Sequence, residues 1–259
     1  MNNALAQLIT RDGYHTLIAG QTGSGKSVLI NNIMTALLGT LPAVDAFVLV
    51  DPKRVELARY KPLARVERFA TEPADIINAL DTVIITMERR YADMERRGLT
   101  LYDGPRVWLI IDELADLMTV SRPAVLPRLQ RIAQLGRAAK ITLIAATQAP
   151  ARKILPAELV LNIPQRIALH CDTAIESRQI IGAPGAELLP RHGYCLRKAP
   201  GEPVTTYAVP LTDETELNAR IAAELRYIRP SAARSAPKPK PSKLYRLGQW
   251  LCDALRAPL

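Results

Sequence analysis

The chain has 259 residues, 48% of them hydrophobic, and its 34 basic and 25 acidic side chains give a net charge of +9. This length and apolar content suffice for one large α/β domain plus a tail, and without a long uncharged apolar run or an N-terminal secretion signal we expect no integral membrane association. Three widely spaced cysteines without C-x-x-C pairs exclude a disulfide framework and a cysteine zinc site, and they indicate reduced thiols in the cytoplasm.

The first predicted strand, residues 15–19, leads into GQTGSGKS at 20–27 and a predicted helix at 26–38. This spacing between a strand and a helix is typical of a P-loop, whose glycines let backbone N–H groups surround phosphate oxygens. We expect Lys26 to reach the β- and γ-phosphates of ATP and the Ser27 hydroxyl to bind Mg²⁺. An ordinary glycine-rich turn is the alternative. The predicted nucleotide-binding residues are Gly20, Gln21, Thr22, Gly23, Ser24, Gly25, Lys26, Ser27 and Val28.

A second predicted strand, residues 46–51, runs into the sequence DPKR. Pro52 is expected to fix the turn, because its ring restricts the backbone. Lys53 and Arg54 then project toward the nucleotide edge of the sheet or toward a subunit interface, in a structural role. A long helix is predicted next, at 73–97.

The third predicted strand, residues 107–112, ends at Asp112 and is followed directly by Glu113. Asp112 is expected to bind the Mg²⁺ shell, and Glu113 to polarise the attacking water. A placed water favours hydrolysis over transfer to a small acceptor. The chain has no guanine-reading N-K-x-D sequence and no L-S-G-G-Q element, so ATP is favoured by exclusion.

A further helix is predicted at 123–139, and the strand at 141–147 ends beside Gln148. At the carboxyl edge of the sheet, where ligands bind, Gln148 is expected to sense the γ-phosphate. The alternative is a hydrogen bond to loop backbone. After a strand at 165–170, GYCLRK and VTTYAVPL are predicted to be a pair of edge strands. Apolar strands separated by helices are typical of a mainly parallel sheet flanked by helices, so the predicted fold class is an α/β P-loop NTPase.

The positive charge is concentrated at the C-terminal end. From Leu225 onward, eight basic residues stand against Asp253 alone, so this end carries +7 of the net charge. The sequence RPSAARSAPKPKPSK is rich in proline, serine and lysine, which is typical of an extended linker. We therefore predict an ATPase domain over residues 1–228, a linker over 229–243 and a short amphipathic segment over 244–259.

In this C-terminal segment, leucines at spacings of three and four fall on one helical face: Leu244, Leu247, Leu251 and Leu255. Such a short helix is not stable alone in water. It is predicted to dock on a protein partner, a neighbouring subunit or an anionic membrane surface, with the linker lysines attracted to DNA phosphates. The alternative is that the segment packs against its own ATPase domain.

Six stretches closely resemble the motor domain of the FtsK/SpoIIIE family of DNA translocases: LIAGQTGSGKSVLINNIM, VLVDPKRVEL, MERRYADM, LIIDELADLM, AQLGRAAKITLIAATQAP and NIPQRIAL. The resemblance spans about residues 13–200, and DPKRVEL and the QLGRAA stretch are more specific than the P-loop alone. It implies a RecA-like motor that assembles as a homohexameric ring and uses ATP hydrolysis to move double-stranded DNA.

The resemblance also implies a role for Arg137. It matches the family's position for an arginine that stabilises charge on the nucleotide of a neighbouring subunit. The alternative is that Arg137 caps the carboxyl end of the predicted helix, where a cation is favoured. The predicted catalytic set is then Lys26, Asp112, Glu113, Arg137 and Gln148.

Arg178 matches the arginine of the family's DNA-contacting SK-x-x-SR pattern, whereas Ala174 replaces its lysine. DNA contact per subunit is therefore expected to be weaker than in the family. The alternative for Arg178 is a surface salt bridge with Glu176 or Asp172. The membrane spans and winged helix of family members that act in cell division find no counterpart here, which favours a motor serving a mobile genetic element or DNA transfer.

Two functions of different classes remain. The first is an ATP-driven translocase whose ring grips the phosphates of duplex DNA without reading bases. The second is an ATP-regulated coupling protein that recruits DNA or a DNA-processing partner without translocating. Glu113 and Gln148 favour the translocase, because an assembly switch has less need of a placed water.

Overall fold

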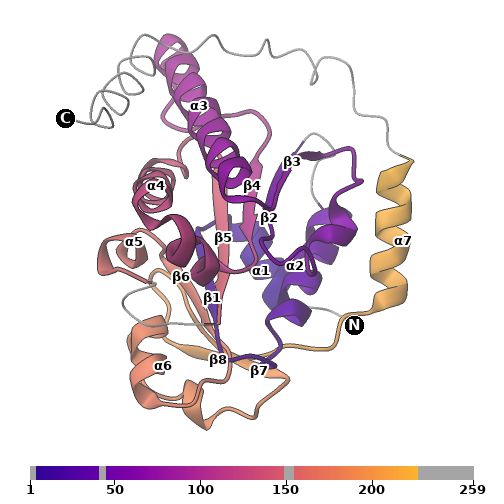
Figure 1. Ribbon diagram of the computed structural model, residues 1–259, viewed down its shortest axis with the longest axis vertical. Helices are drawn as coiled ribbons and strands as arrows, with labels where there is room; N and C mark the ends of the chain where they lie inside the picture. The colour runs from indigo at the N-terminus through magenta and orange to yellow at the C-terminus, as the bar shows by residue number, and fades with distance from the viewer. Residues whose placement is uncertain (1–3, 41–44, 149–154, 227–259) are drawn as a thin grey trace, which may run out of the picture. The chain divides into compact units, whose positions relative to one another are not determined.

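The computed structural model describes residues 4–40, 45–148 and 155–226, and these contain an eight-stranded sheet in the order β3-β2-β4-β5-β1-β6-β7-β8 (Figure 1). All neighbours from β3 to β6 pair in parallel, and β6-β7 and β7-β8 pair antiparallel. This confirms the predicted mainly parallel α/β fold. The strands are β1 (Thr16–Ala19), β2 (Ala46–Val50), β3 (Val66–Ala70), β4 (Val107–Ile111), β5 (Ile141–Thr147), β6 (Gln165–Ala168), β7 (Tyr194–Lys198) and β8 (Thr205–Ala208).

The central strands are buried along their whole length. Every residue of β1, β2, β4 and β5 is buried, which is why their sequences are apolar without polar alternation. Each predicted strand is found within two residues of its expected bounds, except the last, VTTYAVPL, which extends three residues beyond the end of β8. The additional strand β3 lies at the sheet edge and has exposed charged side chains, so its sequence carries only a weak apolar signal.

Helices cover both faces of this sheet. One apolar core joins alternate strand residues to α3 (Pro73–Arg97), α4 (Leu114–Leu135) and α5 (Ala157–Leu161), and a second joins the opposite set to α1 (Ala4–Asp12), α2 (Lys26–Thr40) and α7 (Glu214–Leu225). The helix α6 (Ala174–Ile181) packs beside β6 and β7. Two 3-10 helices, η1 (Ala58–Tyr60) and η2 (Ala186–Leu188), lie in the connections.

The predicted helix at 123–139 is wrong in its bounds. The helix α4 begins at Leu114, where the Glu113 side chain caps it, and ends at Leu135 before Gly136. Ser121 departs from helical geometry inside α4, next to Pro123, so the two prolines of this helix masked the continuity of its apolar pattern. The sequence analysis also did not predict the helices α1, α5, α6 and α7.

Helix α7 is held by two arginines from the β2–β3 connection. Arg59 donates to the Glu214 carboxylate and to Asn218 at 2.8–3.2 Å. Arg65, whose side chain is only 1% exposed, donates two hydrogen bonds of 2.6 and 2.9 Å to the Glu224 carboxylate. Helix α7 is therefore held by ion pairs near both of its ends.

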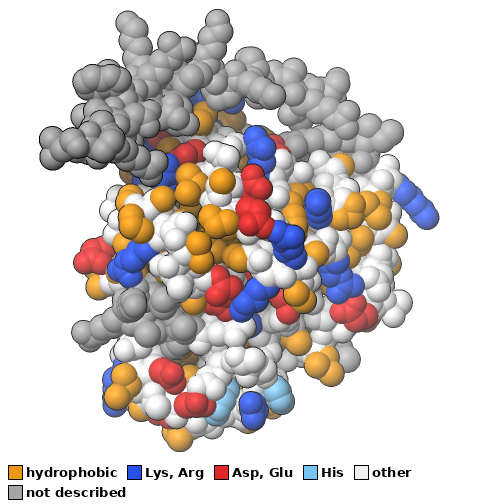
Figure 2. Space-filling view, in the orientation of Figure 1, with side chains coloured by type: hydrophobic (Ala, Val, Ile, Leu, Met, Phe, Trp, Pro, Cys, Tyr) orange, Lys and Arg blue, Asp and Glu red, His pale blue; other side chains and the backbone are white. Residues whose placement is uncertain are grey.

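The predicted linker and C-terminal segment lie outside the described residues. On the face seen in Figure 2, the described basic and acidic side chains are interspersed rather than gathered into a field of one sign. No helix in the described ranges has the length and apolar character needed to cross a membrane.

Candidate nucleotide-binding site

The loop after β1 has the backbone geometry of a phosphate-binding turn. Gly23 and Gly25 have φ angles of +76° and +99°, which disfavour any side chain. A Cβ on Gly20 would lie 2.6 Å from Cβ of Leu169, so this position accepts only glycine without movement of the next strand. The Leu29 N–H donates to the Gly25 carbonyl at 3.0 Å, which places the first turn of α2 directly behind the loop. The N–H groups at the start of α2 thus face an anion site.

Two polar side chains of this loop, Ser24 and Lys26, are buried. Lys26 is only 7% exposed, and burial lowers the pKa of its amine although Glu113 and Asp112 favour the charged form. The buried Ser24 hydroxyl has no hydrogen-bond partner among the described residues. A buried cation and an unpaired hydroxyl at one helix N-terminus fit a bound phosphate group.

Asp112 follows β4 at the same edge of the sheet. Its N–H donates to the Val50 carbonyl at 3.1 Å, which aligns the ends of β4 and β2. Burial, together with the neighbouring charges of Asp51, Glu56 and Glu113, raises the pKa of the Asp112 carboxyl to about 7 against the opposing charge of Lys26. Acidic groups are therefore crowded at a point that favours a cation.

Glu113 is fixed through one of its two carboxylate oxygens. Oε1 accepts from the Thr147 hydroxyl at 3.0 Å, from the Gln148 N–H at 3.0 Å and from the Ala115 N–H at 3.3 Å. The residue is 2% exposed, and Oε2 is buried without a hydrogen bond among the described residues. Its nearest cation is the Lys53 amine, at 3.7 Å. One oxygen holds the side chain in place, and the other accepts no hydrogen bond within the described ranges.

Gln148 links this carboxylate to the P-loop. Its N–H binds Glu113, as above, and its side-chain oxygen accepts from the Thr22 hydroxyl at 2.6 Å. The side chain thus reaches a P-loop side chain rather than only loop backbone. Gly20 completes the junction, since its N–H donates to the Thr147 carbonyl at 3.3 Å.

The loop after β2 contributes groups to which the sequence analysis gave no role. Asp51 is fully buried, and its carboxylate accepts from the N–H groups of Arg54 and Leu57 at 2.8 and 2.9 Å. This turn directs Glu56 to the Ser27 hydroxyl, which donates to it at 2.5 Å. Of the two predicted directions, Lys53 takes the one toward the nucleotide edge, because its amine lies 3.6–3.7 Å from the carboxylates of Asp116 and Glu113. The one signal in the sequence for a role of Asp51 is its place directly after the buried strand β2.

These donors suit Mg²⁺. The Ser27 hydroxyl and the carboxylates of Asp112 and Glu56 are hard oxygen ligands, which magnesium prefers. The crowding that raises the pKa of Asp112 would be relieved by a divalent cation. The residues present therefore fit the predicted metal.

Arg137 lies at the opposite, amino-terminal edge of the sheet. It follows Gly136, whose carbonyl accepts from the N–H of Ile141 at the start of β5. Seven strand residues separate that start from the P-loop edge, about 20 Å at ~3.3 Å per residue. The guanidinium lies 4.9 Å from the centre of the Tyr14 ring. Arg137 therefore cannot serve the nucleotide site of its own chain.

Arg178 is exposed on α6 and does not form the alternative salt bridge with Glu176 or Asp172. The Glu176 carboxylate instead accepts from the N–H groups of Asp172 and Thr173 as part of a capping box. In the described ranges no carboxylate lies within 4.0 Å of the Arg178 guanidinium. Arg178 borders a groove of about 520 Å³ between α5 and α6, which also includes Leu161 and Ile175.

Comparison with known proteins agrees with this geometry. The profile of the FtsK/SpoIIIE family matches residues 2–106. A "DNA translocase FtsK" of Staphylococcus epidermidis is 39% identical over 213 residues, 74% of this chain and 27% of that protein. Another, from Lactiplantibacillus plantarum, is 39% identical over 208 residues, 72% of this chain and 26% of that protein. The chain thus spans about a quarter of the length of these relatives.

Solved structures share the fold. The cytoplasmic domain of the type VII secretion ATPase EccC of Thermomonospora curvata superposes with a TM-score of 0.67 at 27% identity, covering 83% of this chain and 28% of that one. The conjugation coupling protein TcpA of pCW3, solved with ATPγS, gives a TM-score of 0.69 at 24% identity, covering 82% of this chain and 65% of that one. The second likeness bears on the fold alone.

Proposed function

The chain belongs to the FtsK/SpoIIIE family, and on that premise we propose that it is an ATPase motor that moves double-stranded DNA. The observation that carries the proposal is Glu113, buried at the P-loop edge with one oxygen held by three donors and the other without a hydrogen bond among the described residues. A motor must hydrolyse ATP, and such a carboxylate can accept a proton from water. DNA transfer or segregation is the process we propose it serves.

The described residues suggest how the steps are divided. Lys26 and the N–H groups of the loop bind the phosphates, and Ser27 and Asp112 hold Mg²⁺, which supplies charge neutralisation when bound. Glu113 takes a proton from the attacking water through Oε2 as the bond between the γ-phosphorus and the ADP oxygen breaks. Gln148, bound to both Thr22 and Glu113, is placed to report the loss of the γ-phosphate to the residues that follow it.

The two edges of the sheet support a ring of subunits. The P-loop and Asp112 lie at the carboxyl edge, and Arg137 lies at the amino edge about 20 Å away. If Arg137 acts on a nucleotide, that nucleotide belongs to another copy. We propose a homohexamer in which each subunit offers Arg137 to its neighbour's γ-phosphate, the catalytic role proposed for it here.

Contact with DNA is proposed to involve Arg178. Its exposed guanidinium has no carboxylate within 4.0 Å in the described ranges, so it is available to a phosphate oxygen. The apolar side of the neighbouring groove does not match a phosphate backbone and is not part of this proposal.

The decisive test compares ATP turnover and movement on the full chain. A translocase shows ATPase activity that rises strongly with long duplex DNA, and it displaces a third strand from a triplex in an ATP-dependent reaction. The Lys26→Ala variant is the control that has lost phosphate binding. Duplex binding without triplex displacement would favour the coupling protein, and the absence of DNA-stimulated turnover would refute the motor.

The role of Arg137 is tested by mixing variants. Arg137→Ala and Lys26→Ala are each expected to be inactive alone. In mixed rings some interfaces combine an intact P-loop with an intact Arg137, so partial activity should return. No recovery at any ratio, with mixed assembly shown by light scattering or tagged pull-down, would contradict action between subunits.

A further inference from the structure

Arg137 is exposed, and its orientation depends on an aromatic ring. The guanidinium lies over the Tyr14 ring, with 4.9 Å from Cζ to the ring centre. Within the described ranges no carboxylate lies within 4.0 Å of it. Burial, with smaller contributions from the charges of Arg106 and Arg137, lowers the pKa of the neighbouring His15 to about 4. The Arg106 guanidinium adds a positive charge in this neighbourhood, so the Tyr14 ring, rather than an acidic partner among the described residues, holds the Arg137 guanidinium.

The backbone that presents this ring is braced from the β5 side. Gly13, directly before Tyr14, has a φ of +61°, and its carbonyl accepts from the Thr142 hydroxyl at 3.1 Å. Arg106 donates to the same Thr142 hydroxyl at 2.7 Å. The Leu143 N–H donates to Nδ1 of His15 at 2.9 Å. The turn that sets the position of Tyr14 is thus tied to β5, the strand that Arg137 precedes.

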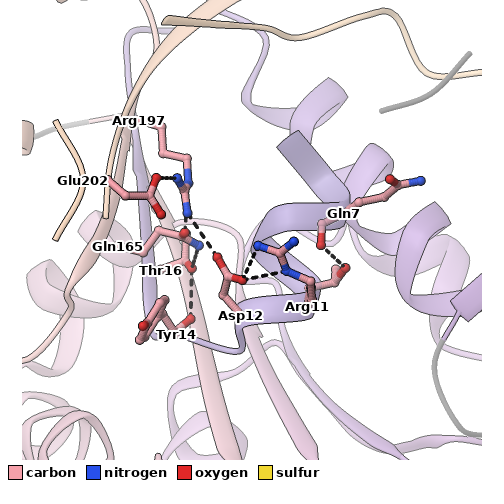
Figure 3. A network of polar contacts seen from close by, with 9 residues as sticks. Gln7, Arg11, Asp12, Tyr14, Thr16, Gln165, Arg197 and Glu202 are labelled. Carbon is pink, nitrogen blue, oxygen red and sulfur yellow. Dashed lines mark hydrogen bonds and ion pairs between the residues drawn. The ribbon is translucent and has the colours of Figure 1, made fainter. Parts of the chain in front are cut away.

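A buried polar network braces the other side, as Figure 3 shows. The Tyr14 carbonyl accepts from the Thr16 hydroxyl at 3.0 Å, and that hydroxyl accepts from the Gln165 amide at 2.9 Å (Figure 3). Arg197, with a side chain 1% exposed, donates to Gln165 at 3.0 Å and to Asp12 at 3.2 Å, and it also pairs with Glu202. The turn that carries the half-buried Tyr14 is therefore held by hydrogen bonds on both sides.

We propose that Tyr14 is a positioning residue that holds the Arg137 guanidinium in the orientation needed to reach the nucleotide of a neighbouring subunit. This inference rests on the proposed trans action of Arg137. The face of the ring attracts the guanidinium that lies over it, and the hydrogen-bonded turn keeps the ring in place. The hydroxyl of Tyr14 is not required by this arrangement, so phenylalanine should replace tyrosine.

The experiment measures DNA-stimulated ATP turnover of the full chain carrying Tyr14→Leu or Tyr14→Phe. Because misplacing a reacting group by about 1 Å costs up to about 100-fold, Tyr14→Leu is expected to lower kcat at least about tenfold while KM for ATP changes less than about twofold. Tyr14→Phe should keep kcat within about twofold of the unaltered chain. Phe69→Leu is the matched control. Phe69 lies on the edge strand β3, and the Lys61 amine lies over its ring, 5.5 Å from the ring centre. Thermal unfolding of all variants separates loss of fold from loss of position.

Subunit mixing distinguishes a positioning role from damage to the P-loop at the other end of β1. Tyr14→Leu retains its own P-loop, so mixing it with Lys26→Ala should restore turnover, as for Arg137→Ala. Unchanged kcat in Tyr14→Leu, or no recovery on mixing while Arg137→Ala does recover, overturns the proposal and leaves the trans action of Arg137 standing. Full turnover in Arg137→Ala overturns the trans action itself, and the role of Tyr14 with it.

Discussion

Replacing Glu113 by glutamine and by alanine should separate its chemical role from its structural one. Glutamine keeps an oxygen that can accept from Thr147, Gln148 and Ala115, so the fold and ATP binding are preserved. What it loses is the proton-accepting oxygen. General base catalysis contributes about 10²–10⁴-fold, so kcat should fall by that factor, about 3–5 kcal/mol of barrier.

Alanine removes the acceptor as well. Hydrogen bonds to a charged group are worth about 1.5–3 kcal/mol each, and two donors lie at 3.0 Å. Part of this loss is offset because a buried carboxylate is no longer crowded against Asp112. We expect Glu113→Ala to lose about 3 kcal/mol and about 6–12 °C in Tm, and Glu113→Gln to lose about 1 kcal/mol or less.

The assays are steady-state ATP turnover with duplex DNA, binding of a fluorescent ATP analogue, and thermal unfolding. Normal turnover in Glu113→Gln would refute its role as the proton acceptor. Equal loss of Tm in both variants would refute the assignment of Oε1 as the structural oxygen.

The remaining predictions concern other parts of the molecule. In the nucleotide-free protein the pKa of Asp112 is raised from its ordinary value near 4 to about 7, so the folded state binds a proton that the unfolded state has lost. The free energy of unfolding therefore falls as pH rises from about 4 to about 7. Asp112→Asn should flatten this fall in scans of Tm against pH, and an unchanged slope would contradict Asp112 as its cause. The pKa of His15 is lowered to about 4, so its contribution is lost as pH falls from about 6.5 toward 4, and His15→Gln should reduce acid sensitivity over that range in the same scans; equal acid sensitivity would count against it. Arg178→Glu should weaken duplex affinity and reduce its salt dependence, measured by fluorescence anisotropy, whereas Arg89→Glu on α3 is the charge-matched control; equal losses in both would point to bulk charge. Deleting residues 231–259 should leave ATP turnover per chain intact and weaken DNA or partner recruitment at low salt, whereas loss of solubility or Tm would place the tail in the core.

The P-loop could be predicted from sequence because its determinants are local. Gly23 and Gly25 need positive φ angles, and Lys26 begins the following helix, so one short stretch carries the whole pattern. Asp112 and Gln148 follow apolar strands, and the carboxyl ends of parallel strands share one edge, so their location was predictable although their partners were not.

The contacts that sequence reasoning missed depend on strand order. Asp51 and Glu56 reach the site because β2 lies next to β4, an arrangement that chain order alone does not give. Lys53 pairs with Asp116 across the same junction. The helix α4 was predicted too short because its prolines and Ser121 interrupt the apolar repeat, and tertiary packing overrides that local preference.

The ion pairs of Arg59 and Arg65 with α7 also determine how this helix resists a mechanical force. Glu224 lies near the carboxyl end of α7, and a force applied to that end would act against its two hydrogen bonds to Arg65. The Arg59–Glu214 pair holds the opposite, amino-terminal end of the same helix. Because α7 packs on α2, the helix that begins with Lys26, a sustained pull from the C-terminal side would be transmitted to the base of the P-loop. The two arginines thus couple α7 mechanically to the helix that begins at the P-loop.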